Sequence, residues 1–153
     1  MRRLVLSSIA LFYILCSSAQ QMNVATFNIR LKTSQDVGNL WNDRKTAVTN
    51  LIKYHEFDIF GIQEGFAEQL DDMQNNLSTY SYIGVGRDDG MKKGEYSAIF
   101  YKKDRFTLIN SGTFWLSETA HDKPNKGWDA ALPRICTWGI FEDKENKKKF
   151  IFM

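Results

Sequence analysis

Helical periodicity is confined to the first half of this chain, and every regular pattern after residue 79 is that of a β-strand. Residues 22–30 and 57–62 are runs rich in apolar and β-branched side chains with no proline, which predicts buried strands. Residues 42–55 and 66–77 repeat apolar side chains at helical spacing. The first half therefore has the order strand, helix, strand, helix.

Strands account for the regular patterns in the rest of the chain. Segments with alternating or apolar character occur at residues 80–85, 96–101, 106–115, 135–141 and 150–152. A tight turn at Lys103 and Asp104 joins two of them, and a polar connection at residues 143–149 joins two more. Strand–helix pairs followed by hairpins predict a layered α/β fold of the α+β type.

Composition indicates one globular domain. The chain has 153 residues, which is the length of a single domain, and aromatic residues make up 14% of it, whereas disordered chains contain few. Lys and Arg total 20 against 18 Asp and Glu, a net charge of +2. This near balance excludes the bulk basic charge of a protein that coats nucleic acid without specificity.

The N-terminus has the three parts of a secretory signal peptide. Arg2 and Arg3 supply the positive start, residues 4–15 are apolar apart from two serines, and the small residues Ser17 and Ala19 form a cleavage site. The apolar stretch is shorter than the roughly 20 residues that span a bilayer. We therefore expect residues 1–19 to be removed after Ala19, the protein to be periplasmic or extracellular, and no stable membrane insertion.

Two alternatives for the N-terminus stay open, an anchored helix and a lipid attached to Cys16. Cleavage would remove both N-terminal arginines and no acid, leaving the exported part neutral. It would also leave Cys136 as the single cysteine, so an internal disulfide is excluded. The exported part must then depend on its core or on a bound metal.

The C-terminus ends on an apolar strand, residues 150–153, without a turn or a polar tail. A sheet that finished there would present an apolar edge, which favours aggregation. We therefore expect the chain to be cut within a larger domain, so that residues 20–153 are its N-terminal part. The alternative is that Met153 is the true C-terminus.

Two polar residues at predicted strand ends are candidates for metal chemistry. Glu64 follows the apolar run at 57–62, and its carboxylate is the kind of oxygen ligand that Mg²⁺ accepts. Asn28 lies toward the end of the first strand, where an amide can orient a phosphate oxygen or a water. The alternatives are a surface acid at a helix start and an ordinary turn asparagine.

Four further residues are candidates for substrate binding. Arg134 follows Pro133 at the start of a strand and could bind a phosphate with its planar fork. Glu95 and Tyr96 open another strand and could face a substrate, and Trp128 lies in a polar loop where its ring could stack on a ligand. A surface arginine and a packing tyrosine are the alternatives.

The two histidines, His55 and His121, have no neighbouring carboxylate or serine at a catalytic spacing. Zinc clusters and Ser-His-Asp or Cys-His sites therefore have no support in this sequence.

The order of the short motifs resembles the N-terminal half of the endonuclease/exonuclease/phosphatase superfamily, and most of all its secreted bacterial members. The likeness extends over about residues 22–153. The segments that carry it are Thr26-Phe27-Asn28-Ile29-Arg30, Gly61-Ile62-Gln63-Glu64, residues 94–101, Pro133-Arg134, and residues 114–118 followed by 127–131.

This resemblance implies part of a four-layer αββα sandwich, in which two mixed sheets lie face to face with helices outside. It implies that Glu64 is the ligand of Mg²⁺, with Mn²⁺ as the alternative ion, and that Asn28 helps to position metal or phosphate. It also implies that Arg134 contacts a substrate phosphate and that Glu95 and Tyr96 line the cleft.

The family's second half carries a catalytic histidine, a Gly-Asp-x-Asn pair and a closing Asp-His pair, and none of these is present here. We therefore expect a secreted, Mg²⁺-dependent phosphoester hydrolase, of nuclease or phosphatase type, whose general base is missing from this chain. By itself the chain should be inactive. The substrate stays open among nucleotides, sugar phosphates and nucleic acid, and no obligate protein partner is evident. The second hypothesis is a non-catalytic exported binding module or an inactive remnant.

Overall fold

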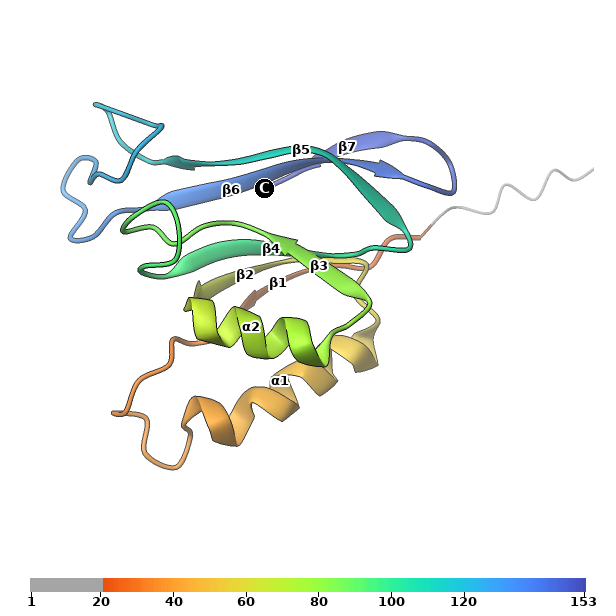
Figure 1. Ribbon diagram of the computed structural model, residues 1–153, viewed down its shortest axis with the longest axis horizontal. Coiled ribbons are helices and arrows are strands. Elements are labelled where there is room, and N and C mark those ends of the chain that lie inside the picture. The colour runs from red at the N-terminus through yellow and green to blue at the C-terminus, as the bar shows by residue number, and fades with distance from the viewer. Residues whose placement is uncertain (1–20) are drawn as a thin grey trace, which may run out of the picture.

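The computed structural model describes residues 21–153, which form three layers: two helices, a four-stranded sheet and a three-stranded sheet (Figure 1). The helices are α1 (Trp41–His55) and α2 (Ala67–Asn76). The strands are β1 (Val24–Asn28), β2 (Ile59–Gly65), β3 (Tyr80–Ile83), β4 (Tyr96–Lys102), β5 (Phe106–Trp115), β6 (Ile135–Asp143) and β7 (Lys149–Phe152). The predicted signal peptide, with Cys16 and Ala19, lies outside the described residues.

The first sheet is mixed and the second is antiparallel. In the first, the strand order is β1-β2-β4-β3, with β1 parallel to β2 and the other pairs antiparallel. The second has the order β5-β6-β7. The predicted layered α+β fold is confirmed, and the described residues form three of the four layers that the family resemblance implies.

The larger core lies between the helices and the first sheet. Phe60 and Phe100 stack on neighbouring strands with ring centroids 5.2 Å apart, and both are fully buried. Ile52 of α1 and Leu70 of α2 pack into the same cluster. Since β1 and β2 are parallel, the helix between them has to cross the sheet face, and this connection places α1 over the core.

A second core lies between the two sheets. Ile59 and Ile99 from the first sheet meet Phe106 and Phe141 from the second. Both helices lie on the opposite side of the first sheet (Figure 1), so within residues 21–153 no helix covers the outer face of the second sheet. None of the described helices is long and apolar enough to cross a bilayer.

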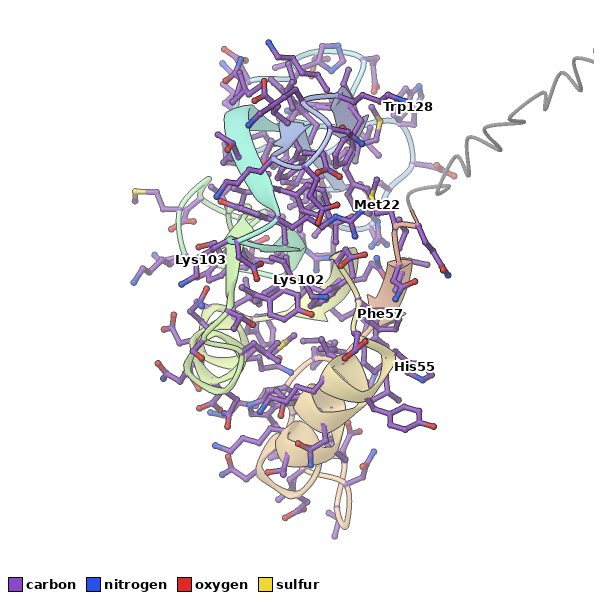
Figure 2. The ribbon with its side chains drawn as sticks, turned by 90° about the vertical axis from the view of Figure 1, so that its right-hand side faces the viewer. Met22, His55, Phe57, Lys102, Lys103 and Trp128 are labelled. Atoms are coloured by element: carbon purple, nitrogen blue, oxygen red, sulfur yellow. The ribbon has the colours of Figure 1, made fainter. Side chains whose placement is uncertain are left out.

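A charged cluster joins the two sheets at the end of the layers where Lys102 and Phe57 lie (Figure 2). Its centre is Asp58, which is only 6% exposed. Its carboxylate accepts from Lys102 Nζ at 2.9 Å, from Arg105 Nη1 at 2.5 Å and from the Asn23 N–H at 2.8 Å. Arg105 also reaches Asp143, at the end of β6, at 3.4 Å. One carboxylate thus ties β2 and β4 to the second sheet.

We expect the free energy of unfolding to fall on acidification as Asp58 becomes protonated. Burial alone would raise the pKa of Asp58, but the Asn23 N–H and the cations of Lys102 and Arg105 outweigh it and hold that pKa below its usual 3.8. The folded state therefore binds fewer protons than the unfolded state, so the stabilisation is present above about pH 4 and is lost below it. Urea unfolding between pH 7 and pH 3 measures this loss. An Asp58→Asn variant should show a shallower acid dependence, and an unchanged one would contradict the assignment.

Candidate active-site cleft

The carboxyl ends of β1 and β2 bring the two predicted metal-site residues together. The strands are parallel and in register, with Asn28 opposite Gln63. The next residue along β2 is Glu64, and Asn28 Nδ2 donates to its Oε1 at 2.8 Å. The two side chains are 36 residues apart in the chain, and the parallel pairing of β1 with β2 brings their backbones together.

A β-bulge directs Glu64. Ile62 pairs with Ala98 and Gly65 with Tyr96, so two residues of β2 lie opposite one residue of β4. Glu64 has a φ of 62°, a left-handed conformation that is strained for a residue with a side chain. Bulges often redirect a side chain beside an active site.

Gly65 completes the bulge for a steric reason. A Cβ atom at this position would lie 2.6 Å from Leu70 Cδ1 and 3.0 Å from Ile62 Cδ1. The start of α2 can therefore approach the strand only where the side chain is absent. In the Gln63-Glu64-Gly65 motif, the bulge sets the direction of the Glu64 carboxylate, and Gly65 allows α2 to pack closely against β2.

A cleft of about 370 Å³ opens beside this bulge. Strands β1 and β2 finish at the same end of the layers (Figure 1). Five of the six predicted site residues line the cleft: Asn28, Glu64, Glu95, Tyr96 and Arg134. The other lining residues are Gln63, Arg87, Ser97, Leu116, Pro133 and Ile135. Both sheets thus contribute to one cleft, because β4 and β6 begin at this end.

Trp128 is not among the residues that line this cleft. Trp128 is 71% exposed. Its backbone N–H donates a hydrogen bond to Glu118 Oε2 at 2.8 Å. Backbone hydrogen bonds, including this one, hold the pKa of Glu118 below its usual range. The loop is thus fixed through its backbone while the ring faces solvent, and the contact between Trp128 and a substrate stays a prediction.

Arg87 is a cleft residue that sequence reasoning missed. It is 8% exposed and makes two hydrogen bonds to Glu95, Nη1 to Oε2 at 2.9 Å and Nη2 to Oε1 at 3.0 Å. The negative charge of Glu95 is therefore balanced inside the cleft. The sequence signal that could have indicated Arg87 is the pair of glycines, Gly86 and Gly94, that flank its loop. In the structure this loop closes so that the Arg87 N–H donates to the Glu95 carbonyl oxygen.

Tyr96 borders the cleft mainly as a packing residue. It is 4% exposed, belongs to the core between the helices and the first sheet, and donates its hydroxyl hydrogen to the Met91 carbonyl at 2.8 Å. Burial, above all, raises the pKa of Tyr96, so the hydroxyl stays protonated as a donor.

Arg134 is an exposed cation at the start of β6. Its carbonyl oxygen accepts from the Leu116 N–H at 2.8 Å, which fixes the backbone beside the cleft. Within residues 21–153 its guanidinium has no hydrogen-bond or ion-pair partner, so its donors are available to an anion.

The donor set fits a hard divalent cation only in part. Glu64 offers a carboxylate, and oxygen ligands suit Mg²⁺, whereas Asn28 directs its Nδ2 to that carboxylate and its Oδ1 to the Arg30 N–H. In residues 21–153 no three acidic, histidine or cysteine side chains gather as a metal site. Mg²⁺ usually keeps several waters and binds one or two carboxylates plus substrate phosphate. These residues thus match an ion held by one carboxylate and completed by other ligands.

Comparisons with known proteins identify similar structures. No protein-family model matches the chain. A crystal structure of an endonuclease/exonuclease/phosphatase family protein from Bacteroides thetaiotaomicron is 50% identical, with a TM-score of 0.84, over 86% of this chain and 48% of that one. A mannosyl-6-phosphatase from the same organism is also 50% identical, with a TM-score of 0.84, over 86% of this chain and 50% of that one.

A more distant similarity joins the chain to an RNA-degrading protein. The CCR4-Not complex 3'-5'-exoribonuclease subunit Ccr4 from Mycosarcoma maydis is 27% identical over 128 residues, 71% of this chain and 19% of that protein. The chain therefore spans about half the length of the similar solved structures and about a fifth of this curated relative.

Proposed function

From the premise that this chain belongs to the endonuclease/exonuclease/phosphatase superfamily, we propose that the natural protein hydrolyses phosphoesters with the help of a divalent cation. The observation that carries the proposal is the Asn28–Glu64 hydrogen bond of 2.8 Å beside a cleft that contains Arg134. A carboxylate, an amide and a cation from three separate strand ends match the needs of a metal-assisted phosphoester site.

In this proposal Glu64 holds the cation, with Mg²⁺ as the first choice and Mn²⁺ as the second. The bound ion would polarise the scissile phosphate and stabilise charge on the leaving oxygen. Asn28 orients the carboxylate through the Oε1 hydrogen bond, and Arg134 binds non-bridging phosphate oxygens with its free donors. Arg87 keeps Glu95 from repelling the phosphate, since it neutralises that carboxylate.

We propose that the group that activates the attacking water is not among the residues that line this cleft. His55 lies at the end of α1, and His121 Nδ1 lies 3.1 Å from the Trp115 carbonyl oxygen, and neither lines the cleft. We propose that a general base from another part of the natural protein completes the site. The alternative is a remnant that binds without catalysis.

A sugar phosphate is the first substrate class that we propose. The support is the 50% identity to a mannosyl-6-phosphatase over 86% of the chain. An RNA phosphodiester is the second, supported by the similarity to the Ccr4 exoribonuclease subunit. Export is compatible with both substrate classes, because an exported hydrolase can release phosphate from either one. We also propose that the predicted signal peptide directs the protein to the periplasm or the exterior.

Removal of divalent ions should abolish hydrolysis by the natural full-length protein. Mannose 6-phosphate, a nucleoside monophosphate and a short RNA are assayed before and after treatment with EDTA, followed by addition of Mg²⁺ or Mn²⁺. We expect loss of activity with EDTA and recovery with either ion, because the ion supplies several kcal/mol of transition-state stabilisation. Hydrolysis that continues unchanged in EDTA would contradict the proposal.

A further inference from the structure

The turn that follows β1, residues 29–32, touches both metal-site side chains through its backbone. The Arg30 N–H donates to Asn28 Oδ1 at 2.9 Å, and the Leu31 N–H donates to Glu64 Oε2 at 3.4 Å. Arg30 has a φ of 59°, which is strained for a residue with a side chain. Such a conformation persists only where surrounding contacts hold it. The position of this turn thus affects where the amide and the carboxylate lie.

A side chain from α1 holds the turn on its carbonyl side. The guanidinium of Arg44 donates to three consecutive carbonyl oxygens, those of residues 29–31. The distance is 2.6 Å to Arg30 and 3.3 Å to Leu31. The rigid, planar fork of an arginine suits this arrangement, because its donors are fixed relative to one another.

A side chain from α2 binds both a carbonyl oxygen and an N–H group of the same turn. Gln69 is fully buried, and its Nε2 donates to the Arg30 carbonyl at 2.9 Å. Its Oε1 accepts from the Lys32 N–H at 2.8 Å and from the Phe66 N–H, at the start of α2, at 3.2 Å. A neutral amide is the group that can donate and accept together without bringing charge into the core.

Each polar backbone group from the carbonyl of Ile29 to the N–H of Lys32 is bound by a side chain. The side chains belong either to the two helices or to the metal site itself. A turn bound in this way favours one position, since a displacement would break several of these partly buried hydrogen bonds at once.

We propose that Gln69 and Arg44 are positioning residues, which clamp residues 29–32 so that the turn orients the Glu64 carboxylate and the Asn28 amide. The geometry is that of outer groups that orient the ligands of a metal. The role in metal binding rests on the proposed function, whereas the clamping of the turn rests on the contacts alone. The two parts are therefore measured separately.

The test uses Gln69→Met in the natural full-length protein, a change that roughly conserves volume but removes the hydrogen bonds to the turn. Hydrogen exchange of the Arg30 and Leu31 amides reports the clamp, and titration with Mn²⁺ reports the metal site. We expect faster exchange at both amides and Mn²⁺ binding weakened about 10- to 100-fold.

The matched control is Met73→Ala, which is also fully buried on α2 but packs only in the core. It should lower the melting temperature while leaving the two amides and the Mn²⁺ affinity unchanged. Gln69→Leu likewise removes the donor to the Arg30 carbonyl and the acceptor of the Lys32 N–H without bringing charge into the core, so it should give the same changes and serves if Gln69→Met does not fold.

Unchanged exchange in both Gln69 variants, or equal changes in Met73→Ala, would overturn the positioning role. A wild-type protein that binds no Mn²⁺ would overturn the proposed function instead, and the exchange rates of the two amides would still decide whether the clamp exists. Arg44→Lys replaces the rigid planar fork by a single ammonium on a flexible stem, so it should reproduce the faster exchange from the side of α1.

Discussion

Replacement of Glu64 by glutamine should lower kcat/KM of the natural protein by about 10²–10³-fold or more. The substitution keeps the shape of the side chain but removes the one carboxylate that, with Asn28, faces the cleft at the end of β2. Loss of the negative charge weakens the hold on a divalent cation, which supplies several kcal/mol to the transition state, and each 1.36 kcal/mol is about a factor of ten in rate. Steady-state assays with saturating and limiting Mg²⁺ measure the loss.

The matched control is Glu68→Gln, four residues further along. Glu68 lies outside the cleft, its side chain is 71% exposed, and its partner is Lys32. This variant should retain nearly the wild-type rate, since exposed ion pairs contribute little. Hydrolysis that survives in Glu64→Gln at the wild-type level, or falls equally in Glu68→Gln, would refute the metal role of Glu64.

Truncation of Asp58 to alanine should destabilise the fold by about 3 kcal/mol, near the low end for breaking a buried ion pair. The change leaves the cations of Lys102 and Arg105 without their shared carboxylate. Their side chains are 26% and 14% exposed, so solvent relieves part of the penalty. Since similar solved structures are about twice as long as this chain, the melting temperature of the natural protein should fall by roughly 6 °C. Thermal and urea unfolding of the natural protein measure the change.

Glu68→Gln is also the control for this experiment, because it breaks an exposed pair instead of a buried one. Its effect should stay within about 1 kcal/mol. If Asp58→Ala were no more harmful than Glu68→Gln, the cluster at that end of the sheets would contribute nothing to holding the layers together.

The local elements were predictable because their signals are local. The helical spacing at 42–55 and 66–77 corresponds to α1 (Trp41–His55) and α2 (Ala67–Asn76) within a residue or so at each end. The strand predicted at 80–85 ends earlier, at Ile83, because Gly84 has a φ of 136° and leaves the strand conformation. The strand predicted at 57–62 instead runs to Gly65, because the bulge opposite β4 prolongs the pairing.

The sequence predicted several of the residues that line the cleft, but not the contacts among them. Polar side chains at strand ends indicated Asn28, Glu64 and Arg134, and these three do line one cleft. The ion pair between Arg87 and Glu95 was not visible, since it depends on how the loop between β3 and β4 closes. The exposed position of Trp128 was equally hidden, because the path of a long loop depends on contacts with distant residues.

Sequence alone thus determined the order of helices and strands, the apolar faces and the residue types at the strand ends, because periodicity and turn chemistry act over a few neighbouring positions. Only the tertiary structure decided that Glu64 lies on a bulge beside Asn28 and that Gln69 and Arg44 hold the turn behind them. These contacts join residues that are 13 to 39 positions apart, so they follow from strand register and helix packing, which no local pattern encodes.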